Sequence, residues 1–130
     1  MQAARYILDA GKSVAYLHTR NPPIIHRDIK PENLLIFPDG TLKMADFGWS
    51  NFKLTNMSRT TYCGTPDYLA PEMITGKGHS EKLDVWALGV LTYELLTGEA
   101  PFTPLSKSMS KEEKKYQLEK NIMVGILSHV

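Results

Sequence analysis

The sequence has one cysteine, no long hydrophobic run and almost no excess of charge of either sign. The single cysteine, Cys63, excludes an internal disulfide framework and is typical of a reducing compartment. The most apolar run, residues 85–96, contains Glu94 and is too short to span a bilayer. A net charge of +1 favours neither nucleic acid nor an anionic membrane as a partner. No N-terminal stretch has the composition of a secretory signal, so we expect an intracellular protein.

Two segments in the first third of the chain predict regular structure. Residues 3–19 carry apolar side chains at helical spacing, including Leu8, and prolines at positions 22 and 23 end that helix. Residues 34–37 and 42–44 are apolar or alternating, and the turn signal Pro38-Asp39-Gly40 lies between them. This pattern predicts a β-hairpin.

The rest of the chain predicts two further helices after a long irregular segment. Residues 46–71 show no sustained period, which in a compact domain points to a functional loop. A central helix over about 84–97 is apolar nearly all round, so we expect it to be buried. Ser110 and Glu113 form a capping-box pattern that opens a last helix over about 111–128, whose apolar face has no later element to pack on. The predicted fold class is mainly α with a small β-hairpin.

One string, residues 26–35, carries groups suited to phosphoryl transfer: His26-Arg27-Asp28-Ile29-Lys30-Pro31-Glu32-Asn33-Leu34-Leu35. That reaction needs a carboxylate to orient the attacking hydroxyl and accept its proton, and cations to neutralise phosphate charge. Asp28 can be that carboxylate, and Lys30 can reach the transferring group. Asn33 offers an oxygen to Mg²⁺, which prefers oxygen ligands.

Two further motifs make catalysis the better interpretation. An Asp and an Asn at this spacing are, by themselves, more often turn chemistry. Here Asp46-Phe47-Gly48 follows the predicted hairpin, and Ala70-Pro71-Glu72 closes the segment 46–72. Asp46 can be a second metal ligand, and Gly48 allows the backbone to turn. Three ordered motifs are very improbable by chance.

With these motifs the sequence resembles a eukaryotic protein kinase from residue 1 to about 102. The resemblance implies a partial kinase domain over 1–130, in which the C-terminal lobe is incomplete and the ATP-gripping N-terminal lobe is absent. It also implies ATP and Mg²⁺ as cofactors. A lysine at position 30 resembles the pattern of the Ser/Thr kinases rather than that of the tyrosine kinases. Residues 26–35 are then the catalytic loop, and residues 46–72 the activation segment.

The same resemblance implies a role for each site residue. Thr65 bridges Asp28 and Lys30, and Asp84 binds back to the catalytic-loop backbone; a simple helix N-terminal carboxylate is the plainer interpretation of Asp84. Nucleotide and metal are held by Lys30, Glu32, Asn33, Leu35 and Asp46. Structural support comes from His26, Phe47, Gly48, Glu72 and Asp84.

Finer features resemble Aurora kinases. These are Trp49 directly after the Asp-Phe-Gly motif, and Arg59-Thr60-Thr61 shortly before Cys63-Gly64-Thr65. Pro66 departs from the Aurora pattern, which leaves another basophilic Ser/Thr kinase as the alternative. Aurora resemblance implies an activating partner protein and association with spindle, centrosome or chromosomes.

Substrate choice and regulation follow from the same resemblance. Glu32 and Glu94 are similar to the carboxylates by which basophilic kinases bind an arginine two residues before the target hydroxyl, although each can also be an ordinary solvated glutamate. Thr61 is at the position of an activating phosphosite, and Arg27 is its expected partner. Neither a Gly-rich phosphate loop nor a strand lysine precedes residue 26. We therefore expect a catalytically silent fragment, with a pseudokinase-like binding module as the alternative.

Overall fold

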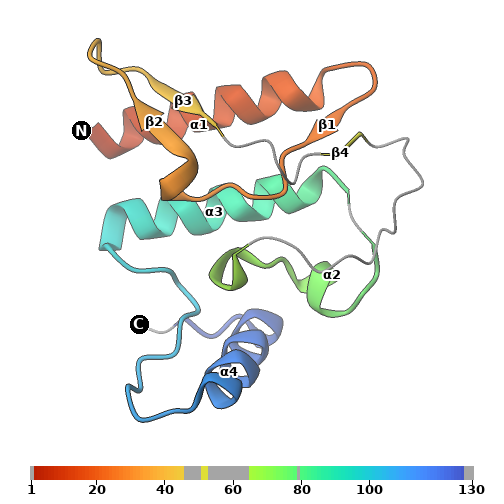
Figure 1. The fold of residues 1–130 in the computed structure, drawn as a ribbon, viewed down its shortest axis with the longest axis vertical. Helices are drawn as coiled ribbons and strands as arrows, with labels where there is room; N and C mark the ends of the chain where they lie inside the picture. Colours follow the sequence, from red (N-terminus) through yellow and green to blue (C-terminus); the bar gives the residue numbers. More distant parts are fainter. Residues whose placement is uncertain (1, 46–50, 53–64, 79, 128–130) are drawn as a thin grey trace.

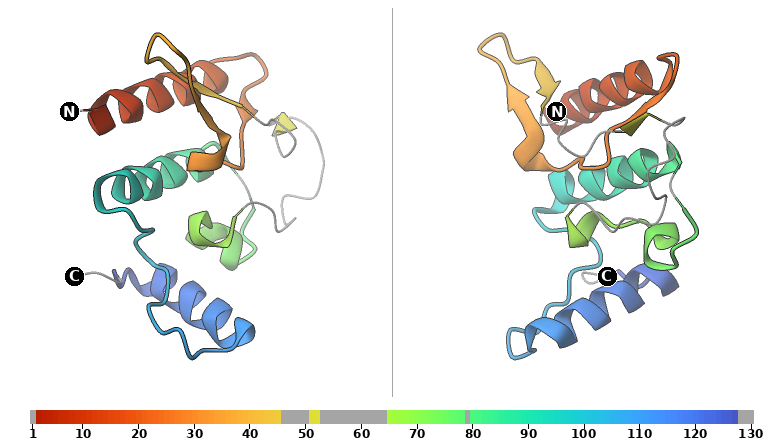
Figure 2. Two further views of the ribbon diagram at one scale, coloured as in Figure 1. Left: turned by 60° about the vertical axis from the view of Figure 1, so that its left-hand side comes forward. Right: turned by 45° about the vertical axis from the view of Figure 1, so that its right-hand side comes forward.

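The computed structural model describes residues 2–45, 51–52, 65–78 and 80–127, which stack in layers on both sides of one long helix (Figure 1). That helix, α3 (Lys82–Thr97), runs antiparallel to α1 (Gln2–His18), and two further views also show these helices side by side (Figure 2). Helices α2 (Pro71–Ile74) and α4 (Lys111–Val124) lie on the other side of α3. The mainly α fold class is therefore confirmed.

The β structure consists of two small antiparallel pairs. The predicted hairpin is present as β2 (Leu34–Ile36) and β3 (Leu42–Met44), and Leu35 lies opposite Lys43. A second pair, β1 (Ile24–Ile25) with β4 (Asn51–Phe52), joins segments on either side of the hairpin. Sequence reasoning missed this pair because two-residue strands carry no measurable period.

Short 3₁₀ turns directly follow Lys30 and Thr65 in the chain. The turn η1 (Pro31–Asn33) leads directly into β2, and η2 (Pro66–Tyr68) precedes α2. Both begin with proline, whose fixed φ suits the first helical position.

Helix α1 buries a narrower stripe than we predicted. Its buried residues are Ala10, Val14 and Leu17, which follow the i, i+4, i+7 spacing of one helix face. Leu8 was predicted to line that face, but its surface is 57% exposed. The reason is angular, because Leu8 is about 200° round the helix from Ala10.

Helix α3 lies between two buried clusters and contributes residues to both. The cluster on the α1 side consists of Ala10, Val14, Ile29, Leu42, Ala87 and Leu91. The cluster on the α4 side consists of Leu69, Val90, Phe102, Leu118 and Ile122. The prediction that α3 is central is thus confirmed, but burial all round is wrong, since Leu96 is 62% exposed. The helix also begins at Lys82 rather than at Asp84.

Helix α4 begins where the capping box predicts and ends earlier than expected. The Ser110 hydroxyl accepts a hydrogen bond from the Glu113 N–H at 3.2 Å, and the Glu113 carboxylate accepts one from the Ser110 N–H at 2.7 Å. Gly125, with φ of 71°, ends the helix after Val124, whereas we predicted an end near residue 128. The apolar face is not without a partner, because Leu118 packs in the α4-side cluster.

None of the helices in the described part of the chain is both long and apolar enough to cross a membrane.

Candidate active site

The loop that carries the predicted catalytic residues is held by one buried carboxylate. Asp84, in the first turn of α3, accepts a hydrogen bond from the His26 N–H at 2.9 Å and another from the Arg27 N–H at 3.0 Å. Arg27 has a φ of 72°, in the left-handed region that side chains other than glycine rarely adopt. Asp84 therefore supports a strained turn immediately before Asp28.

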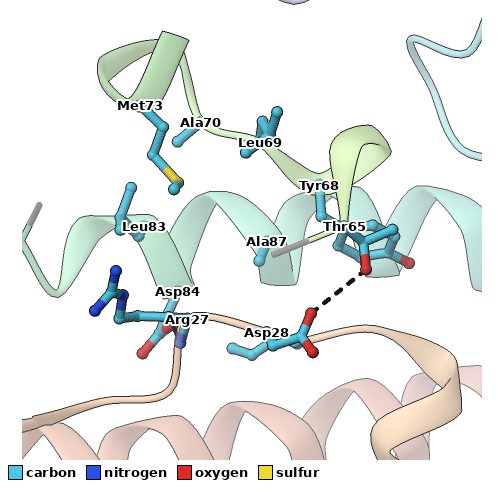
Figure 3. A pocket seen from close by; sticks show the side chains of 11 residues that line it. Arg27, Asp28, Thr65, Tyr68, Leu69, Ala70, Met73, Leu83, Asp84 and Ala87 are labelled. Carbon is cyan, nitrogen blue, oxygen red and sulfur yellow. Dashed lines mark hydrogen bonds between the residues drawn. The ribbon is translucent and has the colours of Figure 1, made fainter. Parts of the chain in front are cut away.

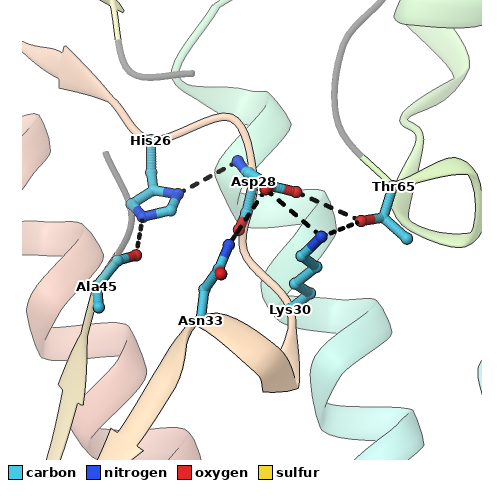
Figure 4. A network of polar contacts seen from close by, with 6 residues as sticks. All are labelled: His26, Asp28, Lys30, Asn33, Ala45 and Thr65. Carbon is cyan, nitrogen blue, oxygen red and sulfur yellow. Dashed lines mark hydrogen bonds and ion pairs between the residues drawn. The ribbon is translucent and has the colours of Figure 1, made fainter. Parts of the chain in front are cut away.

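Asp28 lies at the centre of a polar network (Figure 4). Its Oδ1 accepts a hydrogen bond from the Thr65 hydroxyl at 3.4 Å, and its Oδ2 lies 3.6 Å from Lys30 Nζ. The Lys30 ammonium also donates to Thr65 Oγ1 at 2.9 Å. Because Asp28 is buried, these donors offset the cost of removing its carboxylate from water. The geometry places a carboxylate, an ammonium and a hydroxyl within reach of one another.

Asn33 directs the nitrogen of its side-chain amide to Asp28. Its Nδ2 donates to the Asp28 backbone oxygen at 2.8 Å and to Asp28 Oδ2 at 3.1 Å. The amide oxygen consequently points away from Asp28 (Figure 4). An oxygen directed away from its own network suits a hard cation such as Mg²⁺, so the donor chemistry of Asn33 fits the implied metal.

His26 connects this loop to the end of the hairpin. Its Nδ1 accepts the Asp28 N–H at 3.2 Å, so the ring proton is on Nε2, which lies 3.1 Å from the Ala45 carbonyl oxygen. The Ala45 N–H donates to the Asn33 carbonyl at 2.8 Å. Ala45, the residue before Asp46, is therefore fixed on both sides by the catalytic loop. Asp46 itself lies outside the described residues.

A pocket separates the catalytic loop from the segment that begins at Thr65 (Figure 3). Arg27 and Asp28 line one side, Thr65 and Tyr68 line the other, and α3 closes it with Ala87. The Arg27 side chain extends away from the Asp28 carboxylate along the pocket. Residues far apart in sequence thus face one another across a single cavity.

Tyr68 lies among carboxylates beside this pocket. Its hydroxyl donates a short hydrogen bond to Glu94 Oε2. Burial raises the pKa of the Tyr68 phenol, and the hydrogen bond to Glu94 and the charges of Glu94, Glu32 and Asp67 raise it further. Glu32 and Glu94, which the sequence analysis paired, therefore both raise the pKa of the same phenol.

The remaining predicted residues divide into described and undescribed positions. Leu35 is half exposed on β2, and Glu72 is half-buried on α2 without an ion pair to any described residue. The positions outside the described residues are Asp46, Phe47, Gly48, Trp49, Arg59, Thr60, Thr61, Tyr62, Cys63 and Gly64.

Sequence reasoning missed two contacts of the site region. His18 Nε2 lies 2.7 Å from Asp84 Oδ2, although no motif includes His18. Asp67 accepts a hydrogen bond from the Thr103 hydroxyl at 2.7 Å, which ties the turn η2 to the connection after α3. In the sequence, only the polar residue types could have indicated these contacts, because the two members of each pair lie far apart in the chain.

Comparison with known proteins extends the match beyond these motifs. The family described as "Protein kinase domain" matches residues 1–129, so the expected limit near residue 102 was too short. An Aurora kinase of Schizosaccharomyces pombe is 54% identical over 104 residues, which cover 80% of this chain and 28% of that protein.

Two further relatives give the same result. The Aurora/IPL1-related protein kinase 2 of Caenorhabditis elegans is 53% identical over 100 residues, covering 77% of this chain and 32% of that protein. Aurora kinase A-B of Xenopus laevis is 54% identical over 101 residues, covering 78% of this chain and 24% of that protein. The chain spans about a quarter to a third of the length of these relatives.

Proposed function

Because this chain belongs to the protein kinase family, and within it to the Aurora kinases, we propose that the protein it comes from transfers the γ-phosphate of ATP to serine or threonine side chains of other proteins. The observation that carries the proposal is the contact of Asp28, Lys30 and Thr65, which unites two segments well separated in sequence. Each group has a part in phosphoryl transfer.

Asp28 is the proposed proton acceptor. Hydrogen bonds from Thr65 and Asn33 hold its carboxylate in one orientation. A serine or threonine hydroxyl of the substrate would donate to this carboxylate and lose its proton to it as its oxygen bonds to the γ-phosphorus, while the bond from that phosphorus to the bridging oxygen breaks and ADP leaves. Lys30, beside the same carboxylate, would neutralise charge on the transferring phosphoryl group.

Magnesium and nucleotide would be held by a separate set of groups. Asn33 and Asp46 are the proposed metal ligands, and the outward amide oxygen of Asn33 supports this assignment. Lys30, Glu32 and Leu35 are proposed to contact the nucleotide. When bound, Mg²⁺ screens the phosphate charge and ATP supplies the phosphoryl group.

Substrate recognition is assigned to Glu32 and Glu94. We propose that they bind an arginine two residues before the target hydroxyl, since paired carboxylates match a guanidinium fork. The hydrogen bond from Tyr68 would fix the orientation of Glu94 before the substrate arrives. That support lowers the entropy lost on binding.

Regulation is assigned to Thr61 with Arg27. A phosphate on Thr61 would bring about −1.5 to −2 charge and three acceptor oxygens, and Arg27 next to Asp28 would be its cation. We also propose an activating partner protein, an intracellular location and association with spindle, centrosome or chromosomes, all by analogy with the Aurora kinases.

Replacing Asp28 by Asn in the whole protein tests the proposed function. The variant keeps the shape of the side chain but removes the proton acceptor, so kcat should fall by roughly 10²–10⁴-fold. ATP binding should persist, whereas Asp46→Asn should weaken the use of Mg²⁺-ATP. The measurement is phosphate transfer to a peptide with arginine two residues before serine.

Asp39→Asn is the matched control, because Asp39 lies in the exposed turn of the hairpin and is hydrogen-bonded to Thr41. It should leave kcat unchanged. Near-normal turnover in Asp28→Asn would show that another group accepts the proton. A folded wild-type protein without any phosphate transfer would instead favour the binding module.

A further inference from the structure

A second cavity, of about 410 Å³, lies between the turn η2, the end of α3 and the start of α4. Its lining shares no residue with the pocket of Figure 3. The connection that follows α3 forms one wall, and it passes to α4 on the side of α3 away from α1 (Figure 1). None of the motifs that point to phosphoryl transfer includes this connection, so the reaction alone does not account for the cavity.

One hydrogen bond joins the two cavities. Tyr68 lines the pocket beside Asp28 and donates to Glu94, which lines the second cavity. Under the proposed function, Asp28 receives the target hydroxyl and Glu94 receives the arginine two residues before it. A substrate chain that runs from Asp28 past Glu94 would therefore bring the residues that precede the arginine to the second cavity.

The charged groups of the second cavity come from different elements. Its ammonium groups are those of Lys107, on the connection, and Lys114, on α4. Its carboxylates belong to η2 and to the region where α3 ends, at Asp67, Glu94 and Glu99. Neither lysine forms an ion pair with any residue that the structure describes. Two ammonium groups that line one cavity without such a partner repel each other and attract an anion.

Two of the carboxylates are instead held by hydroxyl groups of the protein. Glu94 accepts the hydrogen bond from Tyr68, and Asp67 accepts one from the Thr103 hydroxyl at 2.7 Å. The second bond fixes η2 to the connection, and both of its members line the cavity. Because these walls are already tied together, less conformational entropy is lost when a ligand enters.

We propose that the second cavity binds an acidic side chain of the protein substrate, at a position before the arginine, and that Lys107 and Lys114 select it. The inference rests on the proposed function, since the path to the cavity begins at the arginine that Glu94 receives. In chain order, the preferred substrate then has an acidic residue, the arginine and the target hydroxyl. Glu94 and Asp67 would repel an acidic residue next to them, so the acidic residue binds on the side of the lysines.

Peptides that differ at one position test this preference with the whole protein. The parent peptide has arginine two residues before serine and alanine at all earlier positions, and each member of the series replaces one alanine by glutamate. At the position that reaches the lysines, kcat/KM should rise about two- to fivefold, because an exposed ion pair contributes about that much. The gain should be in KM, since the cavity contains no reacting group, and should shrink with added salt.

Charge changes at the two lysines identify the cavity as the source of the gain. Lys107→Gln combined with Lys114→Gln should abolish it, and Lys107→Glu combined with Lys114→Glu should replace it by a preference for lysine at the same position. Lys120→Gln, which is exposed on α4 outside the cavity, is the matched control and should keep the gain. Equal kcat/KM across the series in wild type, or a gain that survives the double Gln change, would overturn the proposal.

Peptide binding separates this inference from the proposed function. Fluorescence anisotropy of labelled peptides in which alanine replaces the serine measures affinity without any transfer step. Tighter binding of the glutamate peptide that depends on both lysines, in a protein that transfers no phosphate, would retain the acidic subsite and reject the proposed function. Phosphate transfer without a preference for glutamate would reject the subsite alone.

Discussion

At the scale of a single residue, Tyr68 has a ring in apolar surroundings and a hydroxyl that needs a hydrogen-bond acceptor. Its ring packs beside both buried clusters, while its hydroxyl must find an acceptor, which is Glu94. Ionising the phenol would place a negative charge next to Glu94, Glu32 and Asp67. The pKa of Tyr68 is therefore well above its usual value of 10.0.

We predict that Tyr68 stays protonated at alkaline pH while exposed tyrosines ionise. Since the folded-state pKa is raised, the contact contributes its full stability below about pH 10 and loses it as pH rises further. Spectrophotometric titration should give the same number of phenolates for the folded wild type and Tyr68→Phe up to about pH 11.

Tyr116→Phe is the control for that titration, because Tyr116 is 69% exposed on α4. This variant should lose one phenolate relative to wild type. In denaturant, Tyr68→Phe should also give one phenolate fewer than the wild type. A missing phenolate in folded Tyr68→Phe near pH 10 would contradict the raised pKa.

At the scale of elements, local signals predicted the structure well where neighbouring residues form the contacts. The hairpin turn at residues 38–40 and the capping box at Ser110 are both present, since each is built within a few residues. The predicted end of α4 was wrong because apolar residues such as Ile126 continue the helical pattern past Gly125. A left-handed glycine overrides that pattern.

The activation segment 46–72 is the element that we expect to regulate the protein. We predict phosphate on Thr61 in the active whole protein, and a lower activity for Thr61→Ala, because Arg27 would then lack the group that ties the segment to the catalytic loop. Mass spectrometry and the peptide assay measure the two effects.

Thr60→Ala is the matched control for this prediction and should stay active. Arg27→Ala should make activity insensitive to the phosphate on Thr61. Full activity of Thr61→Ala would remove this switch, and phosphate on Thr60 instead would reassign it.

At the scale of the whole molecule, α3 holds two layers together, but some apolar side chains remain exposed. Leu8 on α1 and Leu96 on α3 are both more than half exposed. Surface of this kind is typical of interfaces or of a tendency to aggregate.

We predict that purified residues 1–130 alone transfer no phosphate and tend to aggregate. The glycine-rich loop and strand lysine of the kinase template are not among these residues, so ATP would lack its main anchors. The peptide assay and light scattering measure both properties, with the whole protein as the comparison. Phosphate transfer by residues 1–130, absent from a matched Asp28→Asn preparation, would contradict this prediction.

The amino-acid sequence by itself determined the family, the hairpin and the residues around Asp28. Those features depend on residue type and short spacing, and Asn33 reaches Asp28 because η1 turns the chain within that short distance. Only the tertiary structure decided which partners meet from distant segments. Lys30 meets Thr65, and His18 meets Asp84, through the packing of α1, α3 and the catalytic loop. Such contacts depend on how buried faces fit together in space, which no local period encodes.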